Sequence, residues 1–231
     1  MAQAAPGESV VSCELSDVVA VPVYTVVPNK RLRYRFIKRT FDILASLIGL
    51  VLLLPLFLIV AIAIFIDDPG PVLFFQERNG LNGRVFRMWK FRSMYKDAPE
   101  KRFEMESQNE LDGPAFKITN DPRVTRVGRL IRKASIDELP QLVNILRGQM
   151  SIVGPRPLPT YETAKLTQQQ RKRLLAKPGL VCYWQVSGRN DIPFDEWMRM
   201  DYRYINEASI LTDLKILCMA VPAVISGKGA E

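Results

Sequence analysis

The feature that most constrains this chain is a run of 24 apolar residues, 43–66, in which Ser46 carries the one polar side chain. As a helix, such a run would be about 36 Å long, which exceeds the hydrocarbon core of a bilayer, about 30 Å. Pro55 lies at the middle of the run, where a proline removes a backbone hydrogen bond and bends the helix. The run therefore predicts a helix–proline–helix unit that associates with a membrane.

Basic residues flank this run on both sides. Six Lys or Arg residues lie within 30–39, and six more lie within 78–96, after Asp67 and Asp68. Positive charge next to a membrane segment favours the cytoplasmic side, so both ends of the run are expected there. A re-entrant hairpin that turns back at Pro55 satisfies both ends, because each half is only about 17 Å long. A single spanning helix that tolerates the proline is the alternative.

The rest of the chain predicts a mainly helical α+β fold, with a small β-hairpin beside the membrane unit. Residues 1–29 contain three prolines and no helical period, which indicates a flexible arm. Strands are predicted at 72–76 and 85–91, joined by an Asn/Gly-rich turn. We expect three parts, namely the arm, a basic flank with the membrane helix at 30–67, and a cytosolic domain at 68–231. Helices are predicted at 97–111, 122–134, 136–147, 160–176, 194–206 and 207–225.

The last of these predicted helices is amphipathic. A helix of this kind lies in the plane of a membrane interface or packs on a protein core, and both interpretations stay open. Its apolar stripe consists of Ile210, Leu211, Leu214, Leu217, Cys218 and Val221.

Composition limits the chemistry that is open to the chain. There is no histidine, which removes the commonest general base and zinc ligand. Cys13, Cys182 and Cys218 have no C-x-x-C spacing and predict neither a disulfide framework nor a thiolate metal site. The formal net charge of +8 predicts attraction to nucleic acid, anionic lipid or nucleotide-like substrates. Any catalysis must therefore use carboxylates, lysine, arginine, tyrosine or cysteine.

Asp137 and Glu138 are adjacent acids within the basic segment 121–157. One interpretation is a capping box, in which Ser135 and Glu138 cap a helix whose positive end both acids stabilise. Pro140 conflicts with this, because it interrupts the first turns of such a helix. The other interpretation is a division of labour, in which one carboxylate attacks phosphorus while the other holds Mg²⁺ together with substrate phosphates.

Basic residues around these acids have their own alternatives. Arg156 stands between two prolines, so its stiff backbone suits a bidentate contact with phosphate. Lys90 and Arg92 alternate with apolar residues in a predicted strand and face either a phosphate or water. A series with a spacing of three forms a basic stripe on a helix, which faces solvent, lipid or substrate: Arg123, Arg126, Arg129 and Arg132.

Seven motifs in order carry a resemblance to a known family. They are KFRSM at 90–94, DPRVTRVGRLIRK at 121–133, DELPQLVN at 137–144, MSIVGPRP at 150–157, KPGL at 177–180, WQVSGRN at 184–190 and DYRY at 201–204. From about residue 38 to 229 the chain resembles the bacterial sugar transferases known as monotopic phosphoglycosyl transferases. The resemblance implies transfer of a hexose 1-phosphate from a UDP-sugar to polyprenyl (undecaprenyl) phosphate, with release of UMP. It also implies a place in the bacterial inner membrane, a domain facing the cytoplasm, and the first step of exopolysaccharide or glycan assembly.

The same resemblance implies roles for particular residues. The catalytic dyad of the family falls on Asp137, as the nucleophile that forms a covalent phospho-sugar, and on Glu138. Both acids would bind Mg²⁺, with Glu138 as the main ligand. Substrate-binding roles fall on Lys90, Arg132, Arg156, Arg189 and Asp201, and we add Arg92 as the strand neighbour of Lys90.

The membrane unit departs from the family pattern at one point. A serine often precedes the proline of the family's re-entrant helix, whereas here Leu54 precedes Pro55, which removes a hydroxyl that could support the bend. The chain otherwise resembles the short form of the family, without further membrane spans. The sequence identifies neither the sugar nor the oligomeric state, and a homo-oligomer is compatible with it.

Two other classes of protein remain as alternatives. A membrane-tethered nucleic-acid-binding protein would explain the net charge, and its binding would weaken steeply with salt, but it gives Asp137 and Glu138 no role. A scaffold that has lost its chemistry would keep the fold without needing the acids or Arg156. We therefore expect an enzyme with lipid and UDP-sugar partners and no nucleic-acid partner.

Overall fold

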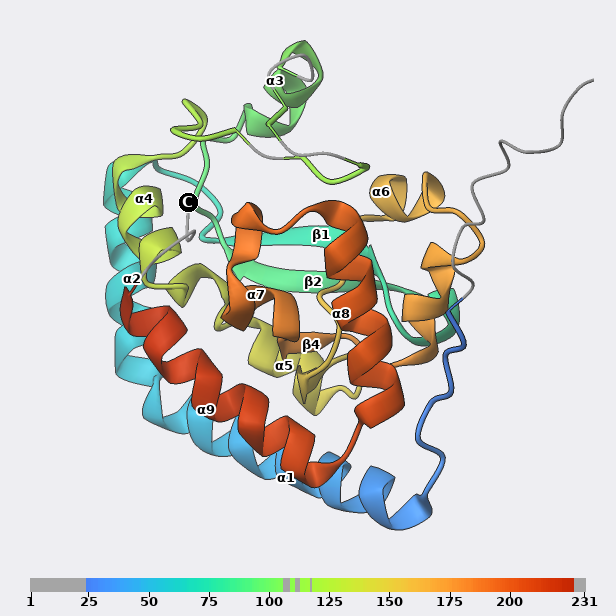
Figure 1. The fold of residues 1–231 in the computed structure, drawn as a ribbon. Helices are drawn as coiled ribbons and strands as arrows, with labels where there is room; N and C mark the ends of the chain where they lie inside the picture. Colours follow the sequence, from blue (N-terminus) through green and yellow to red (C-terminus); the bar gives the residue numbers. More distant parts are fainter. Residues whose placement is uncertain (1–23, 106–108, 111–112, 117, 227–231) are drawn as a thin grey trace, which may run out of the picture.

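The computed structural model describes residues 24–105, 109–110, 113–116 and 118–226. This part of the chain is mainly helical with two small sheets, so the predicted α+β class is confirmed. Figure 1 shows the first two helices along the bottom and left of the molecule, with the sheets and the other helices beside them.

The apolar run folds as two helices that meet at a bend. α1 (Leu32–Leu52) and α2 (Leu54–Asp67) are inclined by 60°, with Leu53 between them. Pro55 lies in the first turn of α2, where its missing N–H costs no helical hydrogen bond. In the described part of the chain no single helix is long and apolar enough to cross a bilayer, whereas the bent pair taken together is. We call α1 and α2 the hairpin.

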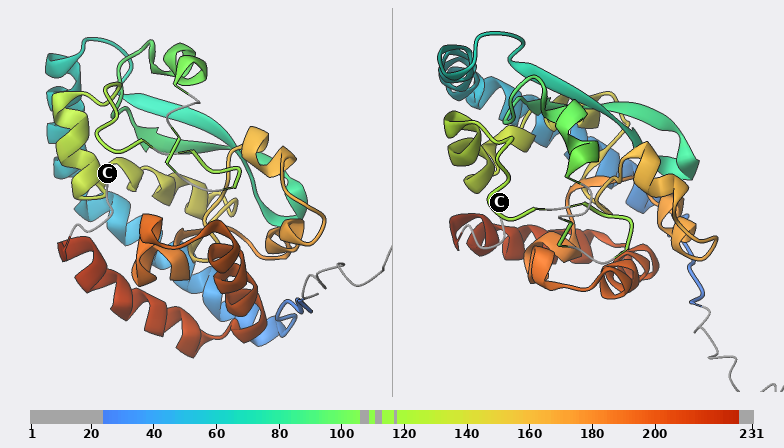
Figure 2. Two further views of the ribbon diagram at one scale, coloured as in Figure 1. Left: turned by 45° about the horizontal axis from the view of Figure 1, so that its top comes forward. Right: turned by 90° about the horizontal axis from the view of Figure 1, so that it is seen from above.

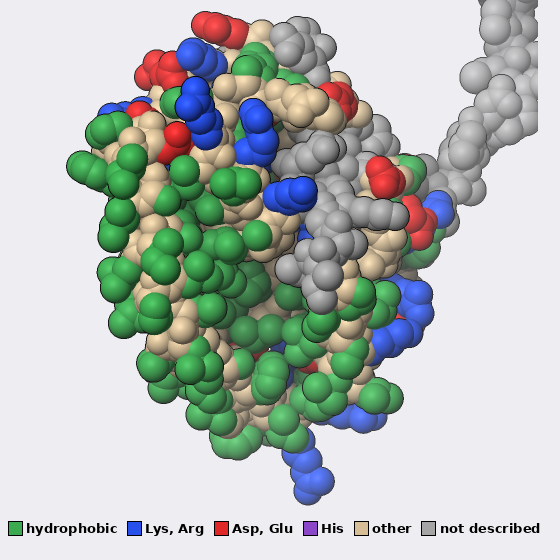
Figure 3. All heavy atoms as spheres, turned by 90° about the vertical axis from the view of Figure 1, so that its left-hand side faces the viewer, with side chains coloured by type: hydrophobic (Ala, Val, Ile, Leu, Met, Phe, Trp, Pro, Cys, Tyr) green, Lys and Arg blue, Asp and Glu red, His purple; other side chains and the backbone are tan. Residues whose placement is uncertain are grey.

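The side chains of α1 are arranged opposite to those of a helix packed on a water-soluble core, whereas α2 buries Val60 and Ile64 in an apolar cluster. On α1 the buried side chains are Asp42 and Ser46, which are 2% and 0% exposed. Figure 3 shows the apolar outer face, with Lys and Arg side chains gathered above it. An apolar surface of this extent marks contact with lipid or protein. Its exposed side chains include Leu44, Leu47, Ile48, Val51, Leu52, Leu54, Leu58, Ile59, Ile62, Phe65 and Ile66.

Two small sheets lie beside the hairpin. β1 (Leu73–Asn79) and β2 (Val85–Phe91) pair antiparallel, close to the predicted strands. Their turn places Asn82 and Gly83 at positive φ, which Asn and Gly adopt most easily. β3 (Ser151–Val153) pairs in parallel with β4 (Gly179–Val181), a sheet that the sequence pattern does not predict because each strand has three residues.

The helix predicted at 194–206 is confirmed as α8 (Phe194–Glu207). Those predicted at 122–134 and 207–225 begin later than expected, and two, at 136–147 and 160–176, are divided. The region 122–134 becomes helical only at Arg126, because Thr125 caps that helix by accepting a hydrogen bond from Gly128 N. The region 136–147 divides at Pro140, and part of 97–111 lies outside the described residues. The elements are α3 (Ala98–Glu104), α4 (Arg126–Lys133), η4 (Ile136–Glu138), α5 (Gln141–Leu146), α6 (Thr160–Ala164), η5 (Gln170–Leu175), α7 (Tyr183–Ser187), η6 (Arg189–Asp191), α8 (Phe194–Glu207), α9 (Ile210–Ser226) and, in the β1–β2 turn, η2 (Leu81–Gly83).

Residues 24–29, predicted as the end of a flexible arm, are bound to α8, whereas residues 1–23 lie outside the described part. Val27 N donates a hydrogen bond to Asn206 Oδ1 (2.8 Å), and Asn206 Nδ2 donates one to Thr25 O (3.0 Å). The amide of one asparagine thus satisfies two backbone groups of the arm, as a neighbouring strand would.

Contacts with the core show how the last helix, α9, is oriented. Ile216 is buried in a core that also contains Ile145, Met150 and Ile205, so this side of α9 faces the protein. Of the predicted stripe, Leu211, Leu214, Cys218 and Val221 are exposed on the outer side, whereas Ile210 is half-buried and Leu217 packs against the core. Figure 2 shows α9 and the β1–β2 sheet on opposite sides of the molecule. The outward apolar stripe favours the interfacial interpretation over core packing.

Candidate active site

Asp137 and Glu138 lie together in η4, and both side chains are buried, 7% and 9% exposed. Ser135, just before them, has φ 56°, a left-handed conformation that a residue with a side chain rarely adopts. In the described structure Ser135 makes no capping hydrogen bond, and α5 begins only at Gln141. The capping-box interpretation is therefore wrong, because the Glu138 side chain turns to other partners.

Two cations hold Glu138. Lys90 Nζ, from β2, donates a hydrogen bond to Glu138 Oε1 (2.7 Å). Arg156 donates to both oxygens of Glu138, from Nη2 to Oε1 (2.7 Å) and from Nη1 to Oε2 (3.2 Å). Lys90 Nζ is 3.7 Å from Asp137 Oδ2, beyond hydrogen-bond distance. The two neighbouring acids thus differ sharply in how strongly they are paired.

This difference sets their protonation. Burial alone would raise the pKa of Glu138, but the charges and hydrogen bonds of Arg156 and Lys90 hold that pKa well below its ordinary value. Burial raises the pKa of Asp137; the Glu138 charge adds to this, and Lys90 opposes it only in part. A buried carboxylate that is weakly paired has oxygen atoms free to form a bond, so Asp137 is the better candidate nucleophile.

The remaining nucleophile class, the thiol, is disfavoured at this site. Cys182 is buried and lies within electrostatic range of Arg156. Burial raises the pKa of Cys182 to about 12, and the Asp201 charge adds to this, so the thiolate is not formed near neutral pH.

Two further arginines hold the backbone of the turn that carries Arg156. Arg173 Nη2 donates to Arg156 O (2.7 Å), and Arg78 Nη1 donates to Pro157 O (2.7 Å). Arg173 is in turn paired with Asp201 (2.7 Å), and both side chains are buried. Two successive carbonyl groups of the turn are therefore fixed, which orients the Arg156 guanidinium.

Arg189 and Arg132 belong to the same cluster. Burial lowers the pKa of Arg189, and the Arg156 charge adds to this while the Glu138 charge opposes it, so Arg189 lies within electrostatic range of both. The charge of Arg132, at the end of α4, acts to lower the pKa of Asp137. The structure thus brings the predicted cations together around the dyad: Lys90, Arg132, Arg156 and Arg189.

Arg92 and Asp201, which were expected to contact substrate, lie in supporting ion pairs. Arg92 donates a hydrogen bond to Asp68 O at the end of α2, and its Nη1 is 3.4 Å from Asp68 Oδ2. Asp201 is 1% exposed and pairs with Arg173. Substrate contact by these two residues stays a prediction; in this structure both side chains are buried, and each is paired with a neighbouring charged residue.

The predicted arginine stripe is not continuous. Arg123 lies before α4 and forms a buried ion pair with Asp121 (2.6 Å). Arg126 and Arg129 are exposed on α4 beside the exposed Leu130. These two arginines form a basic edge next to the apolar outer face, as the lipid-facing interpretation expects.

Sequence reasoning missed Arg78 and Arg173. Arg78 pairs with Phe86 in the β1–β2 register, on the sheet face where Phe86 and Met88 are buried. Strand alternation could therefore have identified Arg78 as an inward-facing cation. Burial, and then the Arg156 charge, lowers its pKa to about 10. Arg173 lies in the irregular segment η5, where no periodic signal marks it.

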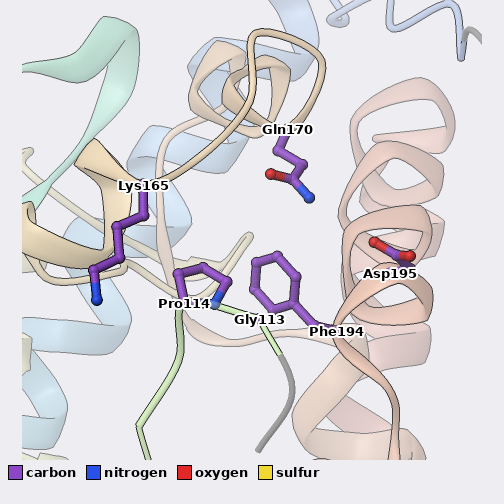
Figure 4. Close-up of a pocket in the computed structure, with 6 residues that line it drawn as sticks. All are labelled: Gly113, Pro114, Lys165, Gln170, Phe194 and Asp195. Atoms are coloured by element: carbon purple, nitrogen blue, oxygen red, sulfur yellow. The ribbon is translucent and has the colours of Figure 1, made fainter.

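A cavity of about 440 Å³ lies elsewhere, and no residue of the dyad or of its four cations lines it. Figure 4 shows Phe194 and Pro114 below Gln170, with Lys165 and Asp195 on either side. Its walls come from the loop at 113–114, from η5 and from the start of α8. This cavity is not part of the cluster described above.

The dyad suits Mg²⁺ only together with a phosphate ligand. Among the residues that the structure describes, no three Asp, Glu, His or Cys side chains form a group that could hold a metal ion. Mg²⁺ is commonly bound by one or two carboxylates and by the phosphates of a substrate. Asp137 and Glu138 fit that pattern.

Comparison with known proteins gives one consistent result. Residues 33–227 match the family described as bacterial sugar transferase. The chain is 43% identical over 215 residues to the galactosyl transferase CpsE of Streptococcus agalactiae, which covers 90% of this chain and 47% of that protein. It is 40% identical over 200 residues to the undecaprenyl-phosphate galactose phosphotransferase of Salmonella typhimurium, covering 85% and 42%.

A third relative is similar in length to the matched region. The exopolysaccharide production protein ExoY of Rhizobium meliloti is 39% identical over 200 residues, covering 84% of this chain and 87% of that protein. The chain thus spans less than half of the first two relatives and most of the third.

Proposed function

The chain belongs to the bacterial sugar transferase family, and we propose that it transfers a hexose 1-phosphate from a UDP-sugar to polyprenyl phosphate, undecaprenyl phosphate in particular, with release of UMP. This would be the first step in assembling an exopolysaccharide or related glycan. One observation carries the proposal: Glu138 is neutralised by two cations, while the adjacent buried Asp137 is approached by Lys90 only to 3.7 Å.

The first step is displacement at the β-phosphorus of the donor. An Asp137 carboxylate oxygen forms a bond to that phosphorus, and the bond from phosphorus to the bridging oxygen breaks, so that UMP leaves with the electron pair. The sugar 1-phosphate is then held on Asp137 as an acyl phosphate. Asp137 suits this role because its ion pair with Lys90 is long, at 3.7 Å, whereas Glu138 is hydrogen-bonded to two cations.

The second step transfers the same phosphorus to the lipid. An oxygen of polyprenyl phosphate attacks it, the bond to Asp137 breaks, and the carboxylate is restored with a polyprenyl diphosphate sugar as product. Two successive steps let the anionic donor and the anionic acceptor use one cationic site in turn. The donor and the acceptor therefore do not have to occupy the site at the same time.

The cations around the dyad stabilise the charge of both substrates. Lys90 and Arg156 donate hydrogen bonds to Glu138, and a phosphate oxygen can replace a carboxylate oxygen as the acceptor of these bonds. Arg132 and Arg189 add positive charge on other sides of the dyad. Mg²⁺, held by Glu138 and Asp137 with donor phosphates, would supply further neutralisation of the departing UMP.

The hairpin explains how a lipid substrate reaches this site. We infer that α1 and α2 form a re-entrant unit in the bacterial inner membrane, with the bend at Pro55 inside the bilayer and residues 68–231 as the catalytic domain on the cytoplasmic side. The apolar outer face and the basic edge at Arg126 and Arg129 support this placement. Polyprenyl phosphate stays in the bilayer and the UDP-sugar in the cytosol, so the site must lie at their boundary.

The test is a panel of UDP-sugars offered with undecaprenyl phosphate to enzyme in bilayers. We expect UMP and a lipid-linked sugar from at least one donor, and neither product from the Asp137→Asn variant. Failure of every donor to release UMP would contradict the proposal and favour a scaffold without chemistry. Salt-sensitive binding of nucleic acid without turnover would favour the nucleic-acid alternative.

A further inference from the structure

The two acidic residues of the hairpin, Asp42 and Asp67, and Asp68 directly after it all turn toward the catalytic domain. Each is bonded to a segment that carries, or leads directly to, Asp137, Glu138 or one of the cations around them. Asp42 binds β3, which leads to Arg156, and Asp67 binds α4, which leads to Asp137. A membrane anchor alone does not require this arrangement.

Asp42 has the most demanding position of the three. It lies in the interior of α1 and is 2% exposed, although aspartate is a poor helix former and its burial is unfavourable without partners. Its Oδ1 accepts two hydrogen bonds, from Ser151 Oγ (3.0 Å) and from Ile152 N (2.9 Å). Both donors belong to β3, and one of them is backbone.

Asp42 takes the place of a missing strand at the edge of β3. On one edge, β3 pairs with β4, through Ser151 N to Pro178 O (2.8 Å) and Gly154 N to Val181 O (3.0 Å). Ile152 N points to the opposite edge, where the Asp42 carboxylate receives it. A buried N–H group needs such an acceptor, so α1 fixes the edge of β3 that no strand covers in the described structure.

The connection from β3 to Arg156 is short and stiff. Three residues, Val153, Gly154 and Pro155, separate Ile152 from Arg156 along the chain. A Cβ on Gly154 would collide with the backbone of Lys177, so the segment has little room to move. The prolines on both sides of Arg156 restrict its backbone further. A shift of β3 therefore also moves the Arg156 guanidinium, because the segment between them is too stiff to compensate.

The far end of the hairpin is fixed in a similar way. Asp67 Oδ2 accepts a hydrogen bond from Val127 N in the first turn of α4 (2.9 Å). Asp68 pairs with Arg92, two residues after Lys90. The hairpin is thus bonded to segments beside the dyad at two places, the middle of α1 and the end of α2.

We propose that Asp42 is a positioning residue of the active site, because by holding the edge of β3 it sets the Arg156 guanidinium against Glu138. The inference rests on the proposed function and adds a role for the hairpin beyond anchoring. The hairpin becomes part of the scaffold that aligns the dyad, and removal of the Asp42 oxygen slows the chemical step without weakening binding to the membrane.

The test compares three variants of the full-length enzyme in bilayers. Asp42→Ala removes the acceptor, whereas Asp42→Asn keeps an Oδ1 that can accept both hydrogen bonds. Ser46→Ala is the matched control, because Ser46 lies one turn further on the same face of α1, is fully buried, and has no hydrogen-bond partner among the described residues. The measurements are the rate of UMP release with donor alone, KM for undecaprenyl phosphate, and the fraction of protein in the membrane.

We expect donor-only UMP release to fall roughly 10- to 100-fold in Asp42→Ala, as a small misplacement of a catalytic group does. Asp42→Asn should stay within about threefold of the wild type, since both hydrogen bonds are kept, and Ser46→Ala should match the wild type. KM for the lipid and the membrane fraction should change less than about twofold in each variant. A purely anchoring role predicts the reverse: normal donor-only release, with a raised KM or a lost membrane fraction.

A second arm covers the case in which Asp42→Ala does not fold. Ser151→Ala removes one of the two donors and leaves Ile152 N bonded, so a loss of about threefold in donor-only release is expected. If Asp42 acts through Arg156, adding Ser151→Ala to Arg156→Ala should slow the enzyme no further. Independent losses that multiply would overturn the inference. Wild-type UMP release in the same assay tests the proposed function separately, so the two can fail independently.

Discussion

The hairpin and the dyad both bury carboxylates, but they pair them with different kinds of group. Asp42 in α1 accepts hydrogen bonds from the backbone N–H of Ile152 and from the hydroxyl of Ser151, a short side chain, both in β3. Glu138 in the dyad is bonded to the ends of two long cationic side chains, Lys90 and Arg156. The first kind of bond fixes main-chain geometry, whereas the second can be exchanged for a bond to phosphate. We therefore expect Asp42 to fix the backbone near the site, and the dyad carboxylates to take part in the reaction.

The same contrast appears in what each region shows to its surroundings. α1 buries Asp42 and Ser46, α2 buries Val60 and Ile64, and the outer face of both helices exposes other leucine and isoleucine side chains. The dyad hides its charges among other charges, on elements that the hairpin contacts. Changes at the dyad should therefore abolish or slow turnover without altering membrane binding. Changes to the residues that hold the Arg156 turn should lower the free energy of unfolding as well.

The change with the largest expected effect is Asp137→Asn, which removes the nucleophile while preserving shape. Turnover should fall by at least about 10³-fold, because no acyl phosphate can form. UMP release is the measurement, and Asp97→Asn is the control, since Asp97 is exposed in the same domain. Near-normal UMP release from Asp137→Asn would refute the assignment.

The next change, Arg156→Lys, keeps the charge but loses the two-pronged contact. We expect a loss of roughly 100-fold in kcat/KM for the donor, because one ammonium cannot replace both guanidinium hydrogen bonds. Arg203→Lys is the matched control, since Arg203 is an exposed arginine paired with Glu207. Equal behaviour of the two lysine variants would show that only the charge at Arg156 matters.

The support of the Arg156 turn should respond in two ways. Asp201→Ala leaves Arg173 buried without its partner, which should lower the free energy of unfolding by about 3–5 kcal/mol and also slow turnover. Replacing both residues by leucine should restore most of the stability, but turnover should stay low because Arg156 O loses its donor. Thermal unfolding and UMP release, measured on the same samples, separate the two effects. Full activity of the double variant would mean that the Arg156 turn keeps its conformation without the hydrogen bond from Arg173.

Glu138→Gln should act mainly on metal dependence. The neutral amide should raise the Mg²⁺ concentration needed for half-maximal rate by roughly 10-fold, since Mg²⁺ prefers charged oxygen ligands. A titration of UMP release against Mg²⁺ gives this value. An unchanged titration curve would remove Glu138 from the metal site.

The smallest effect on activity is expected from cysteines used as topology probes. Arg35→Cys, near the start of α1, and Asp97→Cys, after α2, are placed on either side of the apolar run 43–66, in a background where Cys13, Cys182 and Cys218 are serine. Both probes are at exposed positions, so access to them depends on the membrane alone. An impermeant thiol reagent outside intact cells should label neither, although both should react after lysis. Labelling of one probe in intact cells would mean that the hairpin spans the membrane.

Local sequence patterns predicted the parts of the fold that depend on local physics. The bend follows from Pro55 within an apolar run, and the β1–β2 turn follows from its Asn and Gly residues. The dyad's location among basic residues was also visible. The β3–β4 sheet was not, because it joins two three-residue strands that lie far apart in the chain. Nothing local reveals such a pairing.

The roles of individual charges were harder to predict than their presence. Arg92 and Asp201 look like any other charged residues in sequence, and only tertiary packing shows that each is buried against a partner. Arg123 continues the three-residue spacing of its neighbours, but the helix starts after it, at the Thr125 cap. Sequence reasoning thus found the cluster but could not separate the residues that touch a substrate from those that hold them.

The most direct test of the account is mass spectrometry of the intact enzyme after mixing with donor and no lipid acceptor. We predict a mass increase of one sugar phosphate, located on Asp137 by peptide mapping, absent from Asp137→Asn and lost when undecaprenyl phosphate is added. If no adduct forms with donor alone while product still appears with the acceptor, the two-step account is contradicted.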